Sequence, residues 1–339
     1  MDEKTFLAAL DKFAPSVRQM FLEAIRTLTD DAVLAQLIKA IEAGDAEAAY
    51  RAIGYSPSVF NRFVAMLTTT FEHGGMMMMA SFPKYATDAT GVKSVFRFNI
   101  RDRVAETWLR DRSSALVTQI EDDVRINVRN TLVAGAEAGR NPRSTALDLV
   151  GRYNPQTKQR EGGVIGLGQR EEYWSRSARL KLEALDGSYL DMKLRDKRFD
   201  SIVTAAIKSG KSLPSETVSR LVDRYRANAL RHRGETIGRT ETLAALNRSE
   251  FESVRQALLQ SDLPLAASTK EWDSTGDGDV RPEHRYLDGQ RVGIDEPFVT
   301  RTGTRMMHPG DISLGATGND VIACRCRVKY RTDFAYGVK

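Results

Sequence analysis

Most of the chain follows a helical pattern in which apolar residues recur every three or four positions. Between Lys4 and about Thr70 this pattern is broken at short intervals, so it predicts several short helices packed against one another. The breaks fall at Asp30, Gly44 and Ser56-Pro57. Residues 74–80 then read Gly-Gly-Met-Met-Met-Met-Ala, with Pro83 close behind. The glycines and flexible thioethers predict a connecting segment, either a hinge with an adaptable apolar surface or a loop whose methionines fill a neighbouring groove.

A long helix is predicted next. Its apolar positions step mostly by four and are Ile100, Val104, Trp108, Leu116, Ile120, Val124, Val128 and Leu132. Asn99 is placed as the N-cap, and nothing breaks the row before Gly139, so the pattern predicts one helix of about 38 residues. A helix of this length exceeds those typical of globular proteins and is expected to act as a strut or as a surface for a partner.

A second long helix is predicted from Ser215 to about Gln260. Gly234 lies inside it and costs about 1 kcal/mol relative to alanine, which predicts a kink or a break at that point. Arginines are frequent along the segment. Arg224 and Arg231 are therefore candidate contacts for DNA or an acidic partner, and the alternative is a solvated helix with ion pairs four residues apart.

Beyond Leu265 the pattern changes to short runs that are typical of strands, separated by turn-forming residues. The strand-like runs are 268–272, 285–287 and 321–330. In the last run one face is predicted to carry Ile322, Cys324, Cys326, Val328 and Tyr330, and the other face Arg325, Arg327 and Lys329. This basic face is a further candidate contact for DNA or an acidic partner.

The pattern as a whole predicts a mostly α-helical N-terminal region with long helices and a small C-terminal α+β domain. A chain of 339 residues is long for a single core. The predicted division is a small helical domain (1–72), a Gly/Met-rich linker (73–93), an elongated helical domain (94–260) and the α+β domain (261–339). The net charge of +5 fits contact with nucleic acid or an acidic partner without requiring it. No membrane-spanning run or secretory leader is expected.

Both cysteines and two of the four histidines fall in the C-terminal region. His284, His308, Cys324 and Cys326 are the residue types, and the number, that a tetrahedral zinc ion requires. Cysteines two apart on a strand share a face, but one intervening residue is fewer than zinc sites usually have. The alternative is that both thiols are small core residues, and the sequence itself requires no cofactor.

Arg239 and Glu241 lie between apolar positions of the second long helix. They are predicted to form a buried hydrogen-bonded pair that locks this helix to the next domain, with a catalytic role as the alternative. Residues around the acidic turn after the first strand are expected to form a stabilising network, with acid–base chemistry as the alternative. The predicted structural centre of the C-terminal domain consists of Arg239, Glu241, Trp272, Asp279, Arg281 and His284, and no residue is assigned a catalytic role.

Several weak motifs follow one another in a specific order. They are R-T-E-T (239–242), Trp272, D-V-R (279–281), His284, L-D-G-Q (287–290), P-G-D (309–311) and C-R-C (324–326). In this order they resemble the phage Mu protein F-like family of head morphogenesis proteins, also called minor capsid or minor head proteins. The resemblance covers roughly residues 234–330, and segments 161–167 and 194–200 look like parts of prophage-encoded members. Ala323 departs from the family, which commonly has asparagine there, so any hydrogen bonds made by that side chain are lost.

The resemblance implies a structural, low-copy virion protein rather than an enzyme. It implies assembly in the host cytoplasm with the portal protein and other head proteins, and a final place at the portal-proximal capsid interior beside packaged DNA. Two other classes stay open. One is an ejected effector enzyme, either an ADP-ribosyltransferase or nuclease-like, because domains of this family are found fused to toxins. The other is a DNA-binding packaging accessory, whose binding would weaken steeply with salt.

Overall fold

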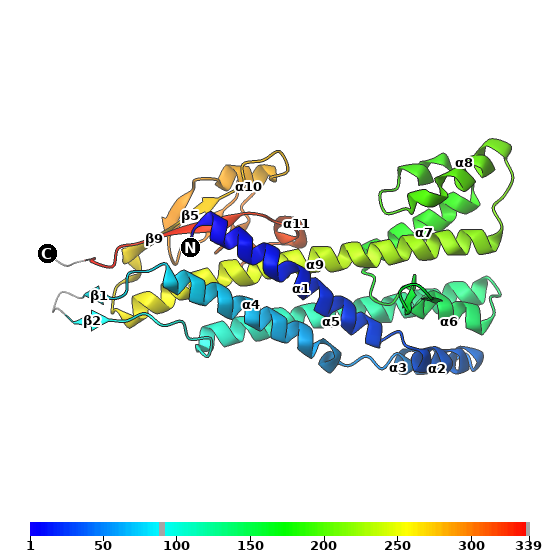
Figure 1. Cartoon of the computed structure of the whole chain (residues 1–339), viewed down its shortest axis with the longest axis horizontal. Coiled ribbons are helices and arrows are strands. Elements are labelled where there is room, and N and C mark those ends of the chain that lie inside the picture. The colour runs from blue at the N-terminus through cyan, green and yellow to red at the C-terminus, as the bar shows by residue number, and fades with distance from the viewer. Residues whose placement is uncertain (88–91, 337–339) are drawn as a thin grey trace. The chain divides into compact units, whose positions relative to one another are not determined.

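The computed structural model describes residues 1–87 and 92–336. It confirms a largely helical N-terminal region with long helices and a small C-terminal α+β region (Figure 1). The α-helices are α1 (Glu3–Thr27), α2 (Asp31–Glu42), α3 (Ala46–Ala52), α4 (Asn61–Ala80), α5 (Arg103–Glu137), α6 (Pro142–Val150), α7 (Gln169–Glu183), α8 (Asp200–Ser209), α9 (Ser215–Gln260), α10 (Pro282–Leu287) and α11 (Gly318–Val321). Short 3-10 helices are η1 (Pro57–Phe60), η2 (Gly187–Asp191), η3 (Lys197–Phe199) and η4 (Leu265–Ala267).

The strands are short and all pair antiparallel. Two hairpins precede the C-terminal region: β1 (Ala86–Thr87) with β2 (Lys93–Ser94), and β3 (Arg152–Asn154) with β4 (Gln159–Glu161). The C-terminal sheet has the order β6-β5-β9, formed by β6 (Arg291–Gly293), β5 (Ser268–Asp273) and β9 (Arg327–Thr332). A separate pair joins β7 (Phe298–Val299) to β8 (Arg305–Met306). The β5–β9 register sets Trp272 opposite Val328 and Asp273 opposite Arg327.

The chain forms two compact units, each built from separate segments of the sequence. The first unit contains Met1–Gln19, Phe63–Ser113 and Glu235–Lys339, and the second contains Met20–Arg62 and Ser114–Gly234. Helices α1, α5 and α9 contribute residues to both units. These boundaries differ from the predicted domains 1–72, 94–260 and 261–339, because each unit joins stretches that lie far apart in the sequence.

One core unites the first unit. It contains Phe6, Leu10 and Phe13 of α1, Leu243 and Leu246 of α9, and Trp272, Leu287, Phe298, Cys324, Cys326 and Val328 of the C-terminal region. Burial of a large apolar side chain contributes about 1.5–3 kcal/mol, so these shared contacts join the α+β region to the helices. The C-terminal region is therefore part of a larger core rather than a separate domain.

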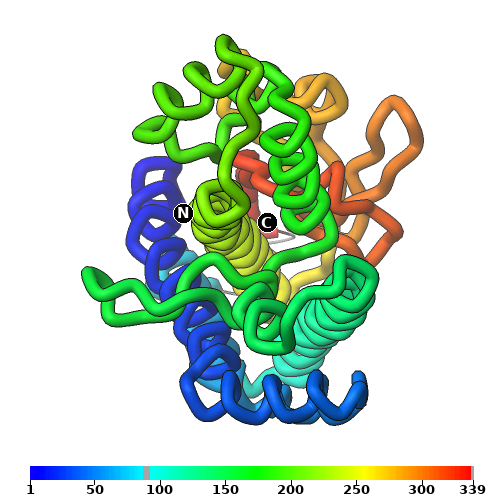
Figure 2. Tube along the Cα trace, turned by 90° about the vertical axis from the view of Figure 1, so that its right-hand side faces the viewer, coloured from blue at the N-terminus to red at the C-terminus, as the bar shows by residue number. Residues whose placement is uncertain are grey.

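The second unit has a core of its own where α7, η2 and α8 pack on the beginning of α9. Figure 2 shows α7 and α8 (green) on one side of α9 in this unit. The buried residues of this core include Ala178, Leu182, Tyr189, Val203, Leu221, Val222 and Tyr225. Their spacing on α9 is that of one helix face.

The first predicted long helix forms as α5, with 35 residues. Its N-terminus differs in detail, because Asp102 accepts hydrogen bonds from the backbone N–H groups of Val104 (3.0 Å) and Ala105 (3.4 Å). Asn99 instead accepts from the N–H of Arg101 at 3.0 Å. Asp102 is therefore the capping residue, three positions after the one predicted.

The second predicted long helix forms as α9 with 46 residues, so the predicted break at Gly234 is wrong. Gly234 is buried, and the side chain of the neighbouring Arg233 binds two partners. Its guanidinium contacts Asp123 at 2.6 Å and donates to the carbonyl of Gly166 at 2.9 Å. Packing of this kind outweighs the roughly 1 kcal/mol that glycine costs inside a helix.

The glycine- and methionine-rich segment is helical through Ala80, so the predicted linker is wrong for residues 73–80. Gly74 and Gly75 are buried, and a Cβ atom at Gly74 would lie 2.3 Å from Oγ of Ser249 on α9. Ser253 of α9 donates to the carbonyl of Gly75 at 3.0 Å. The glycines thus allow close helix packing instead of a hinge. Residues 88–91 of the predicted linker lie outside the described residues.

Two of the predicted C-terminal strands are also corrected. Residues 285–287 belong to helix α10, which begins at Pro282, a residue suited to the first helical position. The run predicted as a strand from Val321 enters β9 only at Arg327. Ala323 has a φ of 53°, a left-handed conformation that an extended strand does not contain, and this interrupts the run before the cysteines.

Candidate functional site

Three of the four predicted zinc ligands come together in the core of the first unit. His284 lies on α10, and Cys324 and Cys326 lie in the segment between α11 and β9. Each of the three is at most 2% exposed. Among the described residues they are the one group of three or more His, Cys, Asp or Glu side chains close enough to hold a metal ion, with ligand atoms all within 4.8 Å of one another.

The contacts within this group are specific. Nδ1 of His284 lies 3.5 Å from Sγ of Cys324 and 3.6 Å from Sγ of Cys326. The backbone N–H of Cys326 donates to Sγ of Cys324 at 3.4 Å. The ring of Trp272 packs edge-on against that of His284, with centroids 5.2 Å apart. Nε2 of His284 is buried and has no hydrogen-bond partner among the described residues.

The two thiols have different acidities because they share one environment. The pKa of Cys324 is lowered, first by a hydrogen bond from the Cys326 thiol and then by His284. The pKa of Cys326 is raised, first by its interaction with Cys324 and then by burial. The pKa values of the two thiols are therefore shifted in opposite directions.

His308, the fourth predicted ligand, does not join this group. It is fully buried in a different cluster, where Nδ1 lies 3.1 Å from the carbonyl oxygen of Pro309. Burial lowers the pKa of His308 to about 4, and Asp311 partly opposes this effect. Gly310 adopts a φ of 85° and lies against Ala244 of α9, which turns this segment toward the helix. The structure thus brings together a His-Cys-Cys set, not a His2Cys2 set.

The predicted pair of Arg239 and Glu241 has a different partner. Glu241 binds Arg112 of α5 through two contacts, Nε to Oε2 at 2.7 Å and Nη2 to Oε1 at 3.1 Å. Arg112 also donates to the carbonyl of Gly310 at 2.9 Å. Glu241 joins α9 to the C-terminal region through Arg112, which no local sequence pattern indicates. Arg239 is half-buried.

The R-T-E-T segment also holds the stretch that carries the cysteines. Oγ1 of Thr240 accepts a hydrogen bond from the backbone N–H of Ala323 at 3.0 Å. Arg281 donates to the carbonyl of Ile322. Trp272 has no exposed surface, whereas the side chain of Asp279 is 91% exposed. Asp279 therefore lies at the edge of this region, not at its centre.

The predicted basic contacts are engaged within the chain. Arg327 contacts Asp273 at 2.8 Å, and Lys329 contacts the same carboxylate at 2.7 Å. Arg325 contacts Asp277 at 2.6 Å. In the second unit Arg224 contacts Glu161 at 3.3 Å, and Arg231 donates to Asn228. Opposite charges nearby weaken Arg224, Arg325, Arg327 and Lys329 as docking points for an anionic partner, whereas the partner of Arg231 is an uncharged amide.

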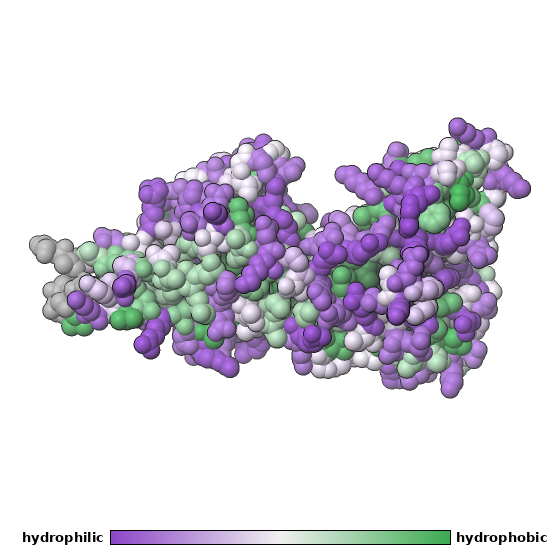
Figure 3. Space-filling view, in the orientation of Figure 1, coloured by the Kyte–Doolittle hydropathy of each residue, from purple (hydrophilic) through white to green (hydrophobic). Residues whose placement is uncertain are grey.

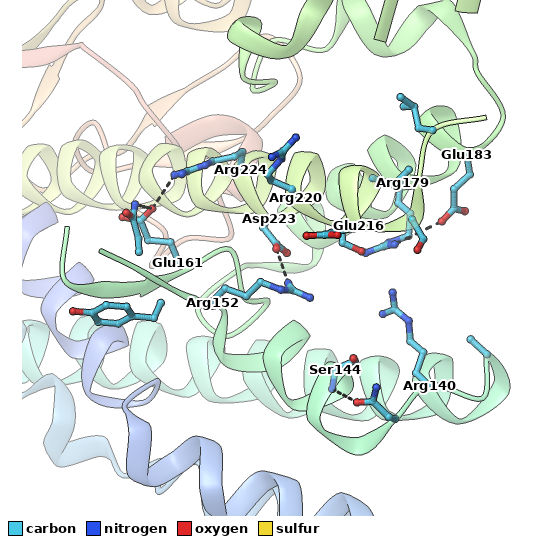
Figure 4. A pocket seen from close by; sticks show the side chains of 18 of the residues that line it. Arg140, Ser144, Arg152, Glu161, Arg179, Glu183, Glu216, Arg220, Asp223 and Arg224 are labelled. Atoms are coloured by element: carbon cyan, nitrogen blue, oxygen red, sulfur yellow. Dashed lines mark hydrogen bonds and ion pairs between the residues drawn. The ribbon is translucent and has the colours of Figure 1, made fainter. Parts of the chain in front are cut away.

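A second candidate is a pocket of about 910 Å³ in the second unit (Figure 4). Its charged lining residues are Arg140, Arg152, Arg179, Arg220, Arg224, Glu161, Glu183, Glu216 and Asp223. Figure 4 shows Arg152 pointing to Asp223, a contact of 2.5 Å. Burial raises the pKa of Asp223 to about 6, and Arg152 opposes this shift. The lining includes no histidine or cysteine, and most of its arginines contact carboxylates.

Comparison with known proteins identifies the part of the chain that contains the His-Cys-Cys group. Residues 197–329 match the family model described as Phage Mu protein F like protein. Over these residues the chain is similar to that family. A search of curated proteins and a search of solved structures each returned no match.

The Mu F-like region includes all of α9 and the C-terminal region up to Lys329. It therefore contains the R-T-E-T segment, His284 and both cysteines, while Arg112 lies outside it. The family points to phage head morphogenesis as the broad role and to the phage particle as the location. Over residues 1–87 and 92–336, no helix has the length and apolar character that crossing a bilayer requires.

Proposed function

We propose that this chain is a minor head protein that acts in head morphogenesis by docking at the portal-proximal interior of a phage capsid. The observation that carries the proposal is the family match over residues 197–329. In this account the protein assembles in the host cytoplasm with the portal protein and other head proteins. It then remains in the virion beside packaged DNA.

The surface of the first unit is consistent with a docking role. On the face drawn in Figure 3, hydrophobic residues gather over α1 and α4 of this unit among polar surroundings. Met76 on α4 is 57% exposed, although Met78 two positions later is buried. An exposed thioether adapts its shape to a partner surface more readily than a branched side chain does.

The charges support proximity to DNA over specific DNA recognition. The net charge is +5, but the basic residues singled out from the sequence contact carboxylates or an amide of the same chain. A protein that releases few counterions on binding DNA shows a shallow dependence of affinity on salt. Filter binding at low and at physiological salt measures this slope, and a steep slope would favour the packaging accessory instead.

A structural role also predicts the absence of turnover. The assay supplies labelled NAD and, separately, plasmid DNA to the purified chain and to the Glu241→Ala and His284→Ala variants. We expect neither labelled product nor cleaved plasmid from any of the three. Turnover by the unaltered chain that disappears in either variant would establish the effector-enzyme alternative.

The place of docking is tested by a reconstruction of the mature particle without imposed symmetry. We expect density for the long helices α5 and α9 at the portal vertex, inside the capsid and in few copies. Density distributed over the capsid lattice, or confined to its outer surface, would contradict the proposal.

A further inference from the structure

We propose that His284, Cys324 and Cys326 bind one zinc ion, with a water molecule as the fourth ligand, and that this ion fastens the segment before β9 to α10. The proposal is independent of the role in head assembly, because it rests on the geometry of three side chains.

The distances within the group match those of a zinc site. Zinc binds cysteine sulfur at about 2.3 Å and histidine nitrogen at about 2.0–2.1 Å, usually at the corners of a tetrahedron. A tetrahedron with these bond lengths separates nitrogen from sulfur by roughly 3.6 Å. The two observed separations, from Nδ1 of His284 to Sγ of Cys324 and of Cys326, are 3.5 and 3.6 Å. Both nitrogen–sulfur separations thus already have the length that coordination requires.

Hydrogen bonding alone explains the arrangement less well. A neutral imidazole has a single N–H, so Nδ1 of His284 can donate to only one of the two sulfur atoms that flank it. Coordination uses the lone pair of Nδ1, which accounts for equal distances to both sulfur atoms.

The charges also balance with a zinc ion present. Two thiolates and one Zn²⁺ make a group with no net charge, and His284 binds as a neutral imidazole. A neutral group avoids the large cost of burying an uncompensated charge, and all three ligands are buried. The N–H of Cys326, which donates to Sγ of Cys324 at 3.4 Å, is the kind of second contact that stabilises a bound thiolate.

The local backbone explains how cysteines with one intervening residue reach the same ion. The left-handed conformation of Ala323 ends the turn after α11, and residues 324–326 then lead into β9. Both sulfur atoms lie within 3.6 Å of Nδ1 of His284, so the two side chains point to the same side. The described residues supply three ligands, so a water molecule completes the tetrahedron. Zinc sites with three protein ligands and a water are usually open, but all three ligands here are buried, so we assign the ion a fastening role.

The first test is the metal content of the full chain, purified without chelator and analysed by elemental mass spectrometry. We expect one zinc per chain, and background levels in His284→Gln, Cys324→Ser and Cys326→Ser. His308→Gln and His73→Gln serve as controls that keep the zinc, the first because His308 lies outside the group. Zinc that persists in all three ligand variants, or zinc lost from His308→Gln alone, would overturn the proposal.

A second measurement uses only the unaltered chain and so holds even if a variant fails to fold. After removal of zinc and loading with Co²⁺, the absorption spectrum should show thiolate-to-cobalt charge transfer and the intense visible bands of tetrahedral coordination. Removal of zinc should also lower the melting temperature. A chain that binds neither Zn²⁺ nor Co²⁺ in excess, with its melting temperature unchanged, would leave the cysteines as core residues and refute the site.

Discussion

Ala323 is held in a conformation that costs energy for its residue type. Its φ of 53° lies in the left-handed region, which is disfavoured by roughly 1–2 kcal/mol for residues with a Cβ atom and is best tolerated by glycine and asparagine. The conformation is maintained because the N–H of Ala323 donates to Thr240 at 3.0 Å. The resemblance places asparagine at this position in the family, and asparagine adopts this left-handed backbone conformation more readily than alanine does.

Ala323→Asn is expected to stabilise the chain by about 0.5–1 kcal/mol, because asparagine enters the left-handed region more readily than alanine. Urea unfolding followed by circular dichroism measures the change. The exposed Ala8 on α1 provides the control, since Ala8→Gly should lower stability by about 1 kcal/mol. A stability of Ala323→Asn at or below that of the unaltered chain would contradict this account of the backbone.

Lys270, on β5 of the first unit, is a buried lysine. It has no exposed surface, and its Nζ donates to the carbonyl of Met307 at 2.9 Å. Burial lowers the pKa of Lys270 from 10.5 to about 7, and Asp311 partly opposes this shift. Between pH 7 and 10.5 the unfolded chain therefore binds more protons at this residue than the folded chain does, so stability contributed by Lys270 rises with pH across that window.

Lys270→Met should remove this rise, because methionine does not titrate. At pH 7 the variant is expected to be more stable than the unaltered chain by about 1–4 kcal/mol, and the difference should shrink toward pH 10.5. Urea unfolding at several pH values in this window gives the slope of stability against pH for the variant and for the unaltered chain. Lys4→Met, at an exposed lysine, should leave the slope of the unaltered chain in place. Equal slopes for Lys270→Met and the unaltered chain would show that Lys270 does not titrate in this range.

At the scale of elements, the buried pair of Arg112 and Glu241 joins α5 to α9 and, through Gly310, to the C-terminal region. Both side chains are at most 9% exposed. Removal of one partner leaves the other charge buried and uncompensated. Glu241→Gln is therefore expected to destabilise the chain by about 3–5 kcal/mol, as measured by urea unfolding.

Two further variants show whether the loss of stability in Glu241→Gln comes from the unpaired buried charge or from substitution in general. The double variant Arg112→Met with Glu241→Met should recover part of the loss, because it removes both charges. Arg101→Gln, which breaks an exposed pair with Glu106, should cost less than about 1 kcal/mol. If Glu241→Gln costs as little as Arg101→Gln, the pair does not join these elements.

Local sequence signals make the helices predictable, but they do not predict the contacts between helices. The apolar rows of α5 and α9 span many turns, so their existence follows from the sequence alone. The partner of Glu241 lies 129 residues away, and no local pattern points to Arg112. From the sequence, Gly74 looks like part of a hinge. Glycine is required there because the residue packs closely against α9, and this contact is visible only in the folded chain.

The candidate site was predictable in part for the same reason. Cys324 and Cys326 are near neighbours, so their common location follows from the spacing. Their meeting with His284 depends on how α10 packs, and the exclusion of His308 depends on the turn at Gly310 against Ala244. Residue type thus indicated the chemistry, while the ligand set required tertiary structure.

At the scale of the whole molecule, the two compact units are each discontinuous in sequence. The first draws on three segments that lie far apart, and α1, α5 and α9 each contribute to both units. Predicted domain boundaries rely on glycine- or proline-rich breaks, and these breaks mark the ends of elements rather than the limits of a core. Residues 197–329, which match the family, likewise include parts of both units.

The central claim is that this chain is required to build the phage head. It is tested most directly by comparing particles made from a phage genome with and without the gene, in head yield, protein composition by mass spectrometry and infectivity. We expect the genome without the gene to give fewer complete heads, particles that lack this chain, and reduced infectivity that the gene restores in trans. Particles unchanged in all three respects would contradict the claim.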